Sequence, residues 1–430
     1  MKIIISIISL LISSVIFSQT LSLDQCLQLA EENYPIIDKI ELLKKNQELN
    51  NKIANIAYYP SISVNASATW QSDVTKIEID NPWFTSFFQD AFPVLSKDQY
   101  KIFAEFSQAI WDGGVNLAQK EIEKAVIEAG ISQVELELFN HKERLVNIFF
   151  AGLGLQKQSE ILDLKKWQLE EVISEMRSLV DNQVVTKTQL DELLAEKLIL
   201  EQKIIEVHYE EQYYLNMLGV YCASKFAENT NLLVPTPQLN LDKNISRPEL
   251  TLFQLQSNQI QANKHLIKSS KMPHIYAFGQ AGYGRPGLDM FKNDFSPYAI
   301  VGAKIVWTPW QWNKTKFQTQ ILDVKSGIIE NTKEIFMINQ NAAIQAQFMK
   351  IEKLREISKT DLEILELREA ITKNYLAQLN GQVIRSSEYL IVLNEENSQR
   401  LQNELHQLIL YEAIVKYNLL KGELYKMSKF

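Results

Sequence analysis

A glycine-rich stretch gives this chain its one formal match to a phosphate-binding motif. Residues 282–287 read Gly-Tyr-Gly-Arg-Pro-Gly, which fits GxGxxG. In a dinucleotide site these glycines open a helix whose N-terminus holds the pyrophosphate. Here a proline lies inside the motif, and residues 288–297 show no helical period. We therefore interpret the stretch as a surface turn that ends a strand, and we expect no cofactor.

The residue types that bind metals or act as nucleophiles show no catalytic spacing. The five histidines have no metal-ligand pattern, and the chain contains neither HExxH nor CxxC. Its two cysteines, Cys26 and Cys222, are far apart in sequence. A disulfide between them is possible outside the cytoplasm, but the sequence does not indicate one. The acidic residues of the helical tracts are interpreted as a solvated face. These patterns predict a protein that is not an enzyme and holds no metal.

Bulk composition excludes further classes. The 430 residues carry a net charge of −8 and are 46% hydrophobic and 22% charged, with a mean hydropathy of −0.15. No basic stripe is present to neutralise phosphates, so we expect no nucleic-acid partner. After residue 20 no stretch has the roughly 18 apolar residues that a membrane-spanning helix needs.

The first residues form a segment of their own. Lys2 precedes an apolar run over residues 3–17, which is followed by Ser18-Gln19-Thr20. This order is typical of a secretory signal peptide, with a short membrane anchor as the alternative. We expect residues 1–19 to be removed and the mature chain to work outside the cytoplasm.

The second half of the chain repeats the first. Asn33-Tyr34-Pro35 aligns with Ser246-Arg247-Pro248, and Pro60 aligns with Pro273 at the same offset of 213 residues. Further along, Trp111 matches Trp307. The offset between these two tryptophans is smaller than 213, and most of the difference arises between the two strands of each half, where the first half has a longer loop. Insertions belong in surface loops, so we interpret the repeat as structural.

Prolines divide each half into two kinds of segment. Residues 115–181 and 311–380 contain none and are rich in strong helix formers. A 67-residue helix would be on the order of 100 Å long, so these helices must pack as antiparallel coiled-coil-like hairpins. We expect a turn after each, with Asn182 and Gly381 in the left-handed conformation, and return helices over 187–220 and 386–427.

The proline-containing segments alternate between polar and apolar residues. In residues 61–70 the serines, Asn65 and Thr69 lie on one face, and Ile62, Val64, Ala66, Ala68 and Trp70 on the other. Residues 100–111, 274–283 and 298–307 are predicted as the other three strands, and the weak alternation of residues 274–283 does not decide which face of that strand is apolar. Each has about ten residues, enough to cross a bilayer as a tilted strand.

Aromatic residues concentrate in the same segments. Residues 58–111 contain twelve and residues 276–312 contain nine. Trp and Tyr at strand ends are typical of a membrane-interface girdle, whereas the alternative is a soluble sandwich core. Four strands cannot close a channel-forming barrel, so either several chains contribute or the sheet lies outside a membrane. The candidate interface aromatics are Trp70, Trp111, Tyr283, Tyr298 and Trp307.

These patterns predict a mixed α and β membrane protein with two structural repeats. Each repeat has a β-hairpin and long antiparallel coiled-coil helices. The expected segments are a signal peptide (1–19), a leading helix (20–59), a first barrel hairpin (60–111), a first helical hairpin (112–222), a linker (223–246), a second leading helix (247–271), a second barrel hairpin (272–309) and a second helical hairpin (310–427).

With these features in place, the mature chain resembles TolC-like outer membrane efflux proteins over almost its full length. Residues 21–35, a Leu- and Ala-containing helix running into Asn33-Tyr34-Pro35, are similar to the opening pattern of that family. Trp111-Asp112-Gly113-Gly114 is similar to its strand exit into the long helix. Gly381-Gln382-Val383 with Ser386-Ser387-Glu388 resembles its helical tip. The order and duplication of these motifs carry the resemblance.

The resemblance implies a homotrimer in which twelve strands close one barrel in the outer membrane lipid. Twelve helices would form a periplasmic tunnel. The implied role is a passive export duct of a tripartite efflux pump or a type I secretion system. Its partners would be a periplasmic adaptor (a membrane fusion protein) and an inner-membrane transporter. The alternative is a soluble periplasmic coiled-coil adaptor or scaffold, which usually has a single hairpin.

The resemblance also places the periplasmic tip and gate. Family members often carry acidic residues shortly after the tip glycine. Here those positions hold Ser387 and Leu390 in the second half and Thr188 and Asp191 in the first. The resemblance therefore does not decide whether this chain has a cation-binding gate. The candidate tip and gate residues are Asn182, Val184, Thr188, Asp191, Glu192, Gly381, Val383, Ser387 and Glu388.

Overall fold

The computed structural model describes residues 20–75, 94–242 and 244–423. The expected signal peptide and residues 76–93 of the first inter-strand loop lie outside the described residues. The chain forms two compact units. One contains residues up to 40, residues 132–251 and residues from 333 onward; the other contains residues 41–131 and 252–332.

Two long helices dominate the chain. Helix α5 covers Val115–Asp181 and helix α8 covers Lys314–Asn380, each with 67 residues. These are the two proline-free tracts, and the long helices predicted there are confirmed. Helix α8 begins slightly later than expected, because Trp312 and Asn313 before it adopt positive φ angles of 48° and 61°. A non-glycine residue in that conformation cannot continue a right-handed helix.

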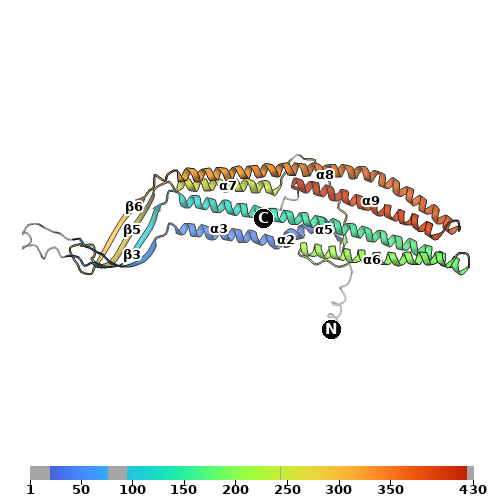
Figure 1. The fold of residues 1–430 in the computed structure, drawn as a ribbon, viewed down its shortest axis with the longest axis horizontal. Helices are drawn as coiled ribbons and strands as arrows, with labels where there is room; N and C mark the ends of the chain where they lie inside the picture. Colours follow the sequence, from blue (N-terminus) through green and yellow to red (C-terminus); the bar gives the residue numbers. More distant parts are fainter. Residues whose placement is uncertain (1–19, 76–93, 243, 424–430) are drawn as a thin grey trace, which may run out of the picture. The chain divides into compact units, whose positions relative to one another are not determined.

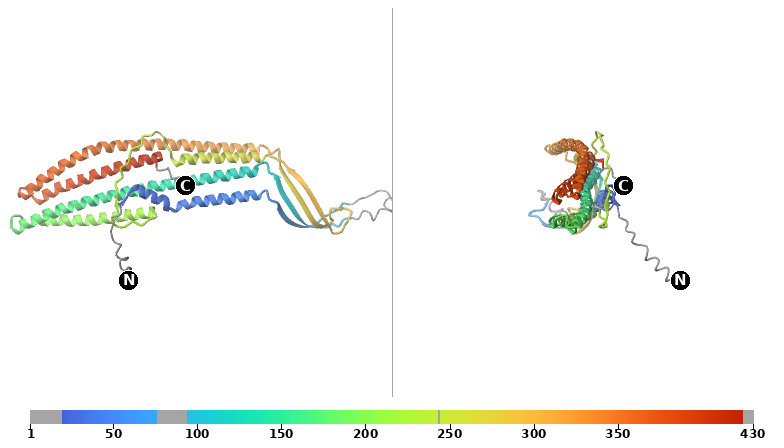
Figure 2. Two further views of the ribbon diagram at one scale, coloured as in Figure 1. Left: turned by 180° about the vertical axis from the view of Figure 1, so that it is seen from behind. Right: turned by 90° about the vertical axis from the view of Figure 1, so that its right-hand side faces the viewer.

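Each long helix is followed by an antiparallel return helix. Helix α6 covers Lys187–Tyr221 and helix α9 covers Ser386–Lys421. The turns of the two helical hairpins lie at the same end of the first unit (Figures 1 and 2). Apolar residues of all four helices pack together below these turns.

The leading segments of the two repeats differ. The first contains helix α2 (Leu23–Asn33), the short 3₁₀ helix η1 (Pro35–Ile37) and helix α3 (Asp38–Ile56). Tyr34 interrupts the helical path with φ −74° and ψ 124°, since a residue before proline avoids the helical region. The second leading segment is the single helix α7 (Pro248–Ser269), whose proline occupies the first helical position.

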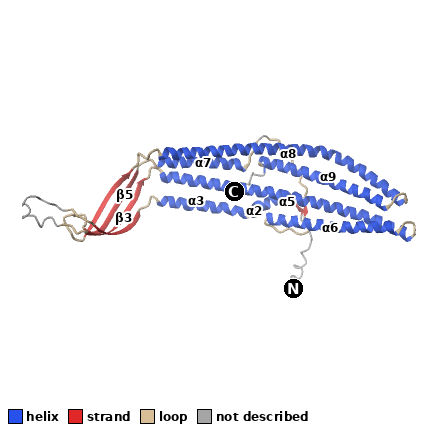
Figure 3. Ribbon diagram, in the orientation of Figure 1, coloured by secondary structure: helices blue, strands red, loops and turns tan. Residues whose placement is uncertain are grey.

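Four antiparallel strands form the sheet of the second unit. They are β2 (Ser61–Trp70), β3 (Asp98–Trp111), β5 (His274–Arg285) and β6 (Ser296–Val306), in the spatial order β2-β3-β5-β6. Figure 3 shows the strands of this sheet in red. The hairpins of the two repeats therefore join through β3 and β5. In the first unit, β1 (Thr20–Leu21) pairs in parallel with β4 (Asn231–Leu232).

The strand register separates an apolar face from a mostly polar one. One cross-strand row is Ile62, Phe106, Gly279 and Val301, and the next is Val64, Ala104, Ala281 and Ala299. A row on the opposite face is Ser63, Glu105, Gln280 and Ile300. The register thus places Ala277, Gly279 and Ala281 of β5 on the apolar face, which the weak alternation of this strand left undecided.

A bulge in β3 changes one expected position. The pairing with β5 is continuous to Ala109 and resumes at Trp111, which faces Ile275, so Ile110 is left between them. An extra residue in one strand shifts every following side chain to the other face. Trp111 therefore takes the place on the apolar face that simple alternation assigned to Ile110.

The largest core of the first unit lies where α2, α5 and α6 meet. Leu145, Phe149 and Leu218 are fully buried there. The ammonium of Lys142 forms a buried ion pair of 2.8 Å with Glu31. No helix in the described part of the chain combines the length and apolar character needed to cross a membrane.

Candidate functional site: the helical turns and the strand face

The two helical turns have the same backbone geometry. In the first, the Val184 amide donates to the Leu179 carbonyl and the Gln183 amide donates to the Val180 carbonyl, both at 2.9 Å. In the second turn, the Val383 amide likewise donates to the Gln378 carbonyl, and the Gln382 amide donates to the Leu379 carbonyl. This pair of hydrogen bonds is the Schellman motif, which satisfies the last carbonyls of a helix.

The left-handed residue of each turn is a glutamine. Gln183 has φ 57° and Gln382 has φ 61°. The expectation that Asn182 and Gly381 adopt this conformation is therefore wrong. Helices α5 and α8 extend to Asp181 and Asn380, so Asn182 and Gly381 are the cap residues and the reversal falls one position later. The tips that differ in sequence are alike in conformation.

The predicted tip residues are mostly exposed. Val184 is 45% exposed and Val383 is 75% exposed, at equivalent positions of the two turns. The side-chain amide of Asn182 donates to the Ser178 carbonyl at 2.9 Å. Glu388 lies in the first turn of α9, where a negative charge is favourable to the helix dipole. Thr188 and Asp191 are also exposed, and Ser387 is half-buried.

Glu192, one of the predicted tip residues, links the two helical hairpins. The hydroxyl of Ser386 donates to Oε2 of Glu192 at 2.9 Å, across 194 positions of sequence. Ser386 is fully buried at the first position of α9, whereas Glu192 lies on α6. The hydrogen bond therefore joins the start of one return helix to that of the other.

Apolar packing supports this connection. Leu169, Val172 and Met176 of α5 belong to one buried cluster with Leu190 and Leu193 of α6. Helices α8 and α9 contribute Leu379, Tyr389, Val392 and Leu393. Because all four helices share this core, the turns are anchored on the same packed layer.

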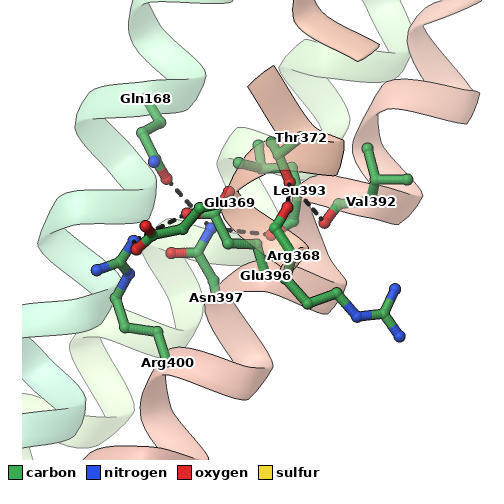
Figure 4. A network of polar contacts seen from close by, with 9 residues as sticks. All are labelled: Gln168, Arg368, Glu369, Thr372, Val392, Leu393, Glu396, Asn397 and Arg400. Atoms are coloured by element: carbon green, nitrogen blue, oxygen red, sulfur yellow. Dashed lines mark hydrogen bonds and ion pairs between the residues drawn. The ribbon is translucent and has the colours of Figure 1, made fainter. Parts of the chain in front are cut away.

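A polar network lies farther along α8 and α9 from the turns (Figure 4). Arg400 donates to Oε1 of Glu369 at 2.6 Å and to Oε1 of Glu396 at 2.9 Å. Thr372 donates to the Arg368 carbonyl at 3.0 Å and to the Val392 carbonyl at 3.3 Å. The network thus crosses from the long helix to the return helix of the second hairpin.

The network also reaches the first hairpin. The amide of Asn397 donates to Oε1 of Gln168 on α5 at 3.1 Å and to the Leu393 carbonyl at 2.9 Å. Asn397 and Glu396 are both buried. A buried charge requires a partner, and Arg400 supplies it for Glu396.

A groove of about 750 Å³ borders this network. It is lined by residues of α5, including Trp167 and Glu175, and by Lys373, Tyr389 and Arg400 of the second hairpin. Burial, together with the nearby Glu396, raises the pKa of Tyr389 to about 12. Its phenol therefore stays neutral near pH 7.

Glu369, Glu396 and Arg400 were not predicted from the sequence, and Ser386 entered only as part of the helical-tip motif. Glu396 and Arg400 carry a local signal, because opposite charges four residues apart face each other on a helix. The pairing with Glu369 follows from antiparallel geometry: residues at similar distances before and after a turn meet across the hairpin. The hydrogen bond of Ser386 gave no signal, since its partner Glu192 belongs to the other repeat.

The predicted interface aromatics lie at the two ends of the sheet. Trp70 ends β2 and Tyr283 lies near the end of β5, at the end where residues 71–97 and 286–295 connect the strands. Trp111 ends β3 next to α5, and Trp307 follows β6 and donates through Nε1 to the Lys271 carbonyl at 3.1 Å. Tyr298 pairs with Gly282 on the opposite, mostly polar face.

The first four residues of the glycine-rich motif lie in the sheet, and Pro286 and Gly287 follow the end of β5. Gly282 and Gly284 lie within β5, and a side chain at Gly282 would meet Cβ of Phe103 at 2.5 Å. The glycines here permit close strand packing. Among the described residues, no group of three or more His, Cys, Asp or Glu side chains is arranged to hold a metal ion.

Comparisons with known proteins give a clear result only for structure. No family model matches the chain. No curated protein matches it in sequence. Several solved structures, in contrast, share its fold over almost the whole chain.

Three of these structures are outer membrane proteins. VceC from Vibrio cholerae superposes with a TM-score of 0.64 at 12% identity, covering 94% of this chain and 95% of its own. The outer membrane channel CmeC from Campylobacter jejuni gives a TM-score of 0.65 at 13% identity, and the match covers 95% of this chain and 87% of CmeC. The open-state outer membrane channel MtrE from Neisseria gonorrhoeae gives 0.64 at 12% identity, with coverages of 97% and 95%. The resemblance to TolC-like outer membrane channels is confirmed at the level of the fold.

Proposed function

We propose that this chain, which has the fold of TolC-like outer membrane channels, is a passive export duct of the outer membrane. In this proposal three copies contribute four strands each to one twelve-stranded barrel, and their helices form a tunnel that extends into the periplasm. The duct serves a tripartite efflux pump or a type I secretion system. A periplasmic adaptor and an inner-membrane transporter dock at its helical end.

The observation that carries the proposal is the exposed apolar face of the sheet. Ile62, Val64, Val301 and Ile305 are 75%, 72%, 87% and 69% exposed, although they lie on the apolar face. Within the described residues, the outer edges of β2 and β6 have no partner strand. A sheet with one apolar face and two open edges is stable in a bilayer only when further strands close it.

The aromatic residues support a bilayer location for this face. Tyr283 lies beside Ile102, and Trp111 lies beside Ile275, eight positions from Tyr283 along β5. At about 3.3 Å per residue this separation is roughly 26 Å, or about 20 Å along the barrel axis for strands tilted by ~40°. The apolar band of outer membrane barrels is about 25 Å high and is flanked by aromatic side chains.

The helical end supports the docking part of the proposal. Val184 and Val383 are exposed at equivalent positions of two turns with the same backbone geometry. Apolar side chains of this kind at a helical tip are suited to contact a partner coiled coil. We place the gate among Asn182, Thr188, Asp191, Glu192, Gly381, Ser387 and Glu388, the remaining tip residues.

Membrane insertion can be tested with one matched pair of variants. Val301 lies midway along β6 on the apolar face, and Ser63 lies at a similar height on the opposite face. An arginine facing lipid near the bilayer midplane costs about 2–4 kcal/mol, whereas an arginine facing the lumen is tolerated. Val301→Arg should abolish heat-sensitive trimers in the detergent-extracted outer membrane, and Ser63→Arg should preserve them. Equal behaviour of both variants would contradict a lipid-facing apolar face.

Fractionation separates the proposal from its alternative. A soluble periplasmic monomer would favour a coiled-coil adaptor or scaffold, the other function compatible with long helical hairpins. The gate is tested by conductance in planar bilayers. If Asp191→Ala with Glu388→Ala leaves pore size and cation preference unchanged, these carboxylates do not form the constriction.

A further inference from the structure

The two cysteines of the chain lie against each other. Cys26 belongs to α2 and Cys222 follows the last residue of α6, yet Sγ of Cys222 is 3.6 Å from the Cys26 carbonyl oxygen. Both are fully buried in one apolar core with Leu23, Leu27 and Leu218. A 430-residue chain with two cysteines in total thus brings them together from positions 196 residues apart.

Local structure fixes the backbone at both positions. Ser22 and Gln25 form a reciprocal capping box at the start of α2, and the Cys26 amide donates to the Ser22 carbonyl. At the end of α6, the Ser224 amide donates to the Gly219 carbonyl at 2.9 Å, and Ala223 takes a positive φ of 49°. This is a third Schellman motif, with Cys222 as its cap residue.

The surrounding chain holds these two ends together. Strands β1 and β4 pair in parallel, and the Leu233 amide donates to the Leu21 carbonyl at 3.0 Å. The segment before α2 is thereby tied to the segment after α6. The cysteines share one buried cluster with Leu21 of β1 and Leu232 of β4. Neither thiol can move far without disturbing packed neighbours.

From this arrangement we infer that Cys26 and Cys222 form a structural disulfide in the mature protein, joining the first leading helix to the end of the first helical hairpin. The inference rests on the proposed location outside the cytoplasm, because disulfides persist in oxidising compartments. Both cysteines are thiols in the present structure, which corresponds to the reduced form.

The oxidant of this step is a protein or low-molecular-weight disulfide. One cysteine thiolate attacks a sulfur of that disulfide, forms a mixed disulfide and releases the first thiol. The second cysteine then attacks its partner in the mixed disulfide, forms the intramolecular S–S bond and releases the second thiol. The two cysteines lose two protons and two electrons, and the oxidant becomes two thiols.

Folding sets the time at which this bond can form. The contact with Cys222, together with burial, raises the pKa of the Cys26 thiol, so its reactive thiolate is disfavoured in the folded state. Both side chains are also fully buried, which keeps an oxidant away from the folded pair, so oxidation takes place before α2 and α6 have closed over it. Once formed, the bond is shielded from reductants by the same core.

The test uses full-length protein expressed with its own N-terminus and checked for processing. It is denatured without reductant, alkylated with iodoacetamide and weighed by mass spectrometry. We expect no adduct before reduction and two adducts after it. Tryptic digestion should give a peptide ending at Lys39 linked to residues 204–225. The unreduced chain should also migrate faster in denaturing gels, and Cys222→Ser should abolish this difference.

Two free thiols in processed, membrane-extracted protein would overturn the inference and leave the proposed duct intact. If the protein is not exported, the proposed location fails instead, and the disulfide is judged by refolding in a mixture of reduced and oxidised glutathione. Formation of the same linked peptide there supports the geometry, and its absence overturns the inference. Cys26→Ser, which leaves one free thiol, controls for adventitious intermolecular bonds.

Discussion

The hydroxyl of Ser386 and the carboxylate of Glu192 lie 2.9 Å apart at the starts of the two return helices. This hydrogen bond connects the helical hairpins of the two repeats just beside their turns. Under the proposed function, the hairpin ends must separate or rotate when the duct opens. The Ser386–Glu192 contact is then one of the interactions that stabilise the closed arrangement.

Removing the Ser386 hydroxyl should loosen this end of the helices. A hydrogen bond of this type contributes about 1 kcal/mol, so Ser386→Ala should speed amide hydrogen exchange in the first turns of α6 and α9 about fivefold. Glu192→Gln keeps an acceptor oxygen and should have a smaller effect. Ser387→Ala, at the half-buried neighbouring position, is the control. Equal exchange in Ser386→Ala and Ser387→Ala would contradict the role of this bond.

The turn geometry predicts opposite outcomes for two adjacent residues. Gln382 adopts the left-handed conformation that glycine tolerates best, so Gln382→Gly should stabilise the second turn by about 1 kcal/mol. Gly381 is not left-handed, so alanine there meets no backbone strain, and its Cβ would need only a small shift because it would lie a tight 3.3 Å from the Ala377 carbonyl. Gly381→Ala should therefore be tolerated. The measurement is hydrogen exchange of the Val383 amide, which donates to Gln378. Strong destabilisation by Gly381→Ala would instead support the sequence-based prediction that Gly381 is the left-handed residue.

Arg400 should matter more than exposed arginines with similar partners. Its removal leaves the buried Glu396 without a compensating charge, and Arg400→Met should lower the free energy of unfolding by on the order of 3 kcal/mol. The control is Arg355→Met, because Arg355 pairs with Glu352 on the surface, where such a pair contributes about 0–1 kcal/mol. Both are measured by thermal unfolding in detergent.

A double variant distinguishes charge from packing at this site. Arg400→Met combined with Glu396→Leu removes both charges and should recover most of the lost stability, since a buried ion pair can be replaced by apolar residues. If the double variant is less stable than Arg400→Met, the network acts through hydrogen bonds that an apolar pair cannot replace.

Asp112 predicts a pH dependence at the start of α5. Its carboxylate accepts the Gly114 amide at 2.9 Å, the Asn116 amide at 2.7 Å and the Tyr58 hydroxyl at 3.0 Å. Burial opposes ionisation, but these hydrogen bonds outweigh it and lower the pKa of Asp112 below its usual 3.8. The stabilisation is therefore complete above about pH 5 and is lost as the pH falls through the lowered pKa.

The expected size of this effect is modest because the carboxylate is partly exposed. Unfolding measured between about pH 5 and 3 should show a loss of a few tenths to 1 kcal/mol attributable to Asp112. Asp112→Asn has nearly the same shape but cannot ionise, and its amide nitrogen replaces one acceptor oxygen, so the variant should be less stable and should lack this pH-dependent component. An unchanged pH profile in Asp112→Asn would assign the acid sensitivity to other carboxylates.

The sequence by itself determined the elements of this fold. Proline-free runs of strong helix formers specify α5 and α8, because local propensity and the absence of breakers act over each turn of a helix. Strict alternation in residues 61–70 specifies both the strand and its faces, because successive side chains in a strand point to opposite sides. The repeat predicted that both halves have the same order of elements.

Tertiary structure decided the relations that depend on distant partners. Pairing with β3 determined which face of the weakly alternating strand β5 is apolar. The bulge before Trp111 placed Trp111, instead of Ile110, on the apolar face. The hydrogen bond of Ser386 with Glu192 and the contact of Cys26 with Cys222 join positions 194 and 196 residues apart. Local propensity and period carry no information about such pairs, since each is set by how whole helices pack against one another.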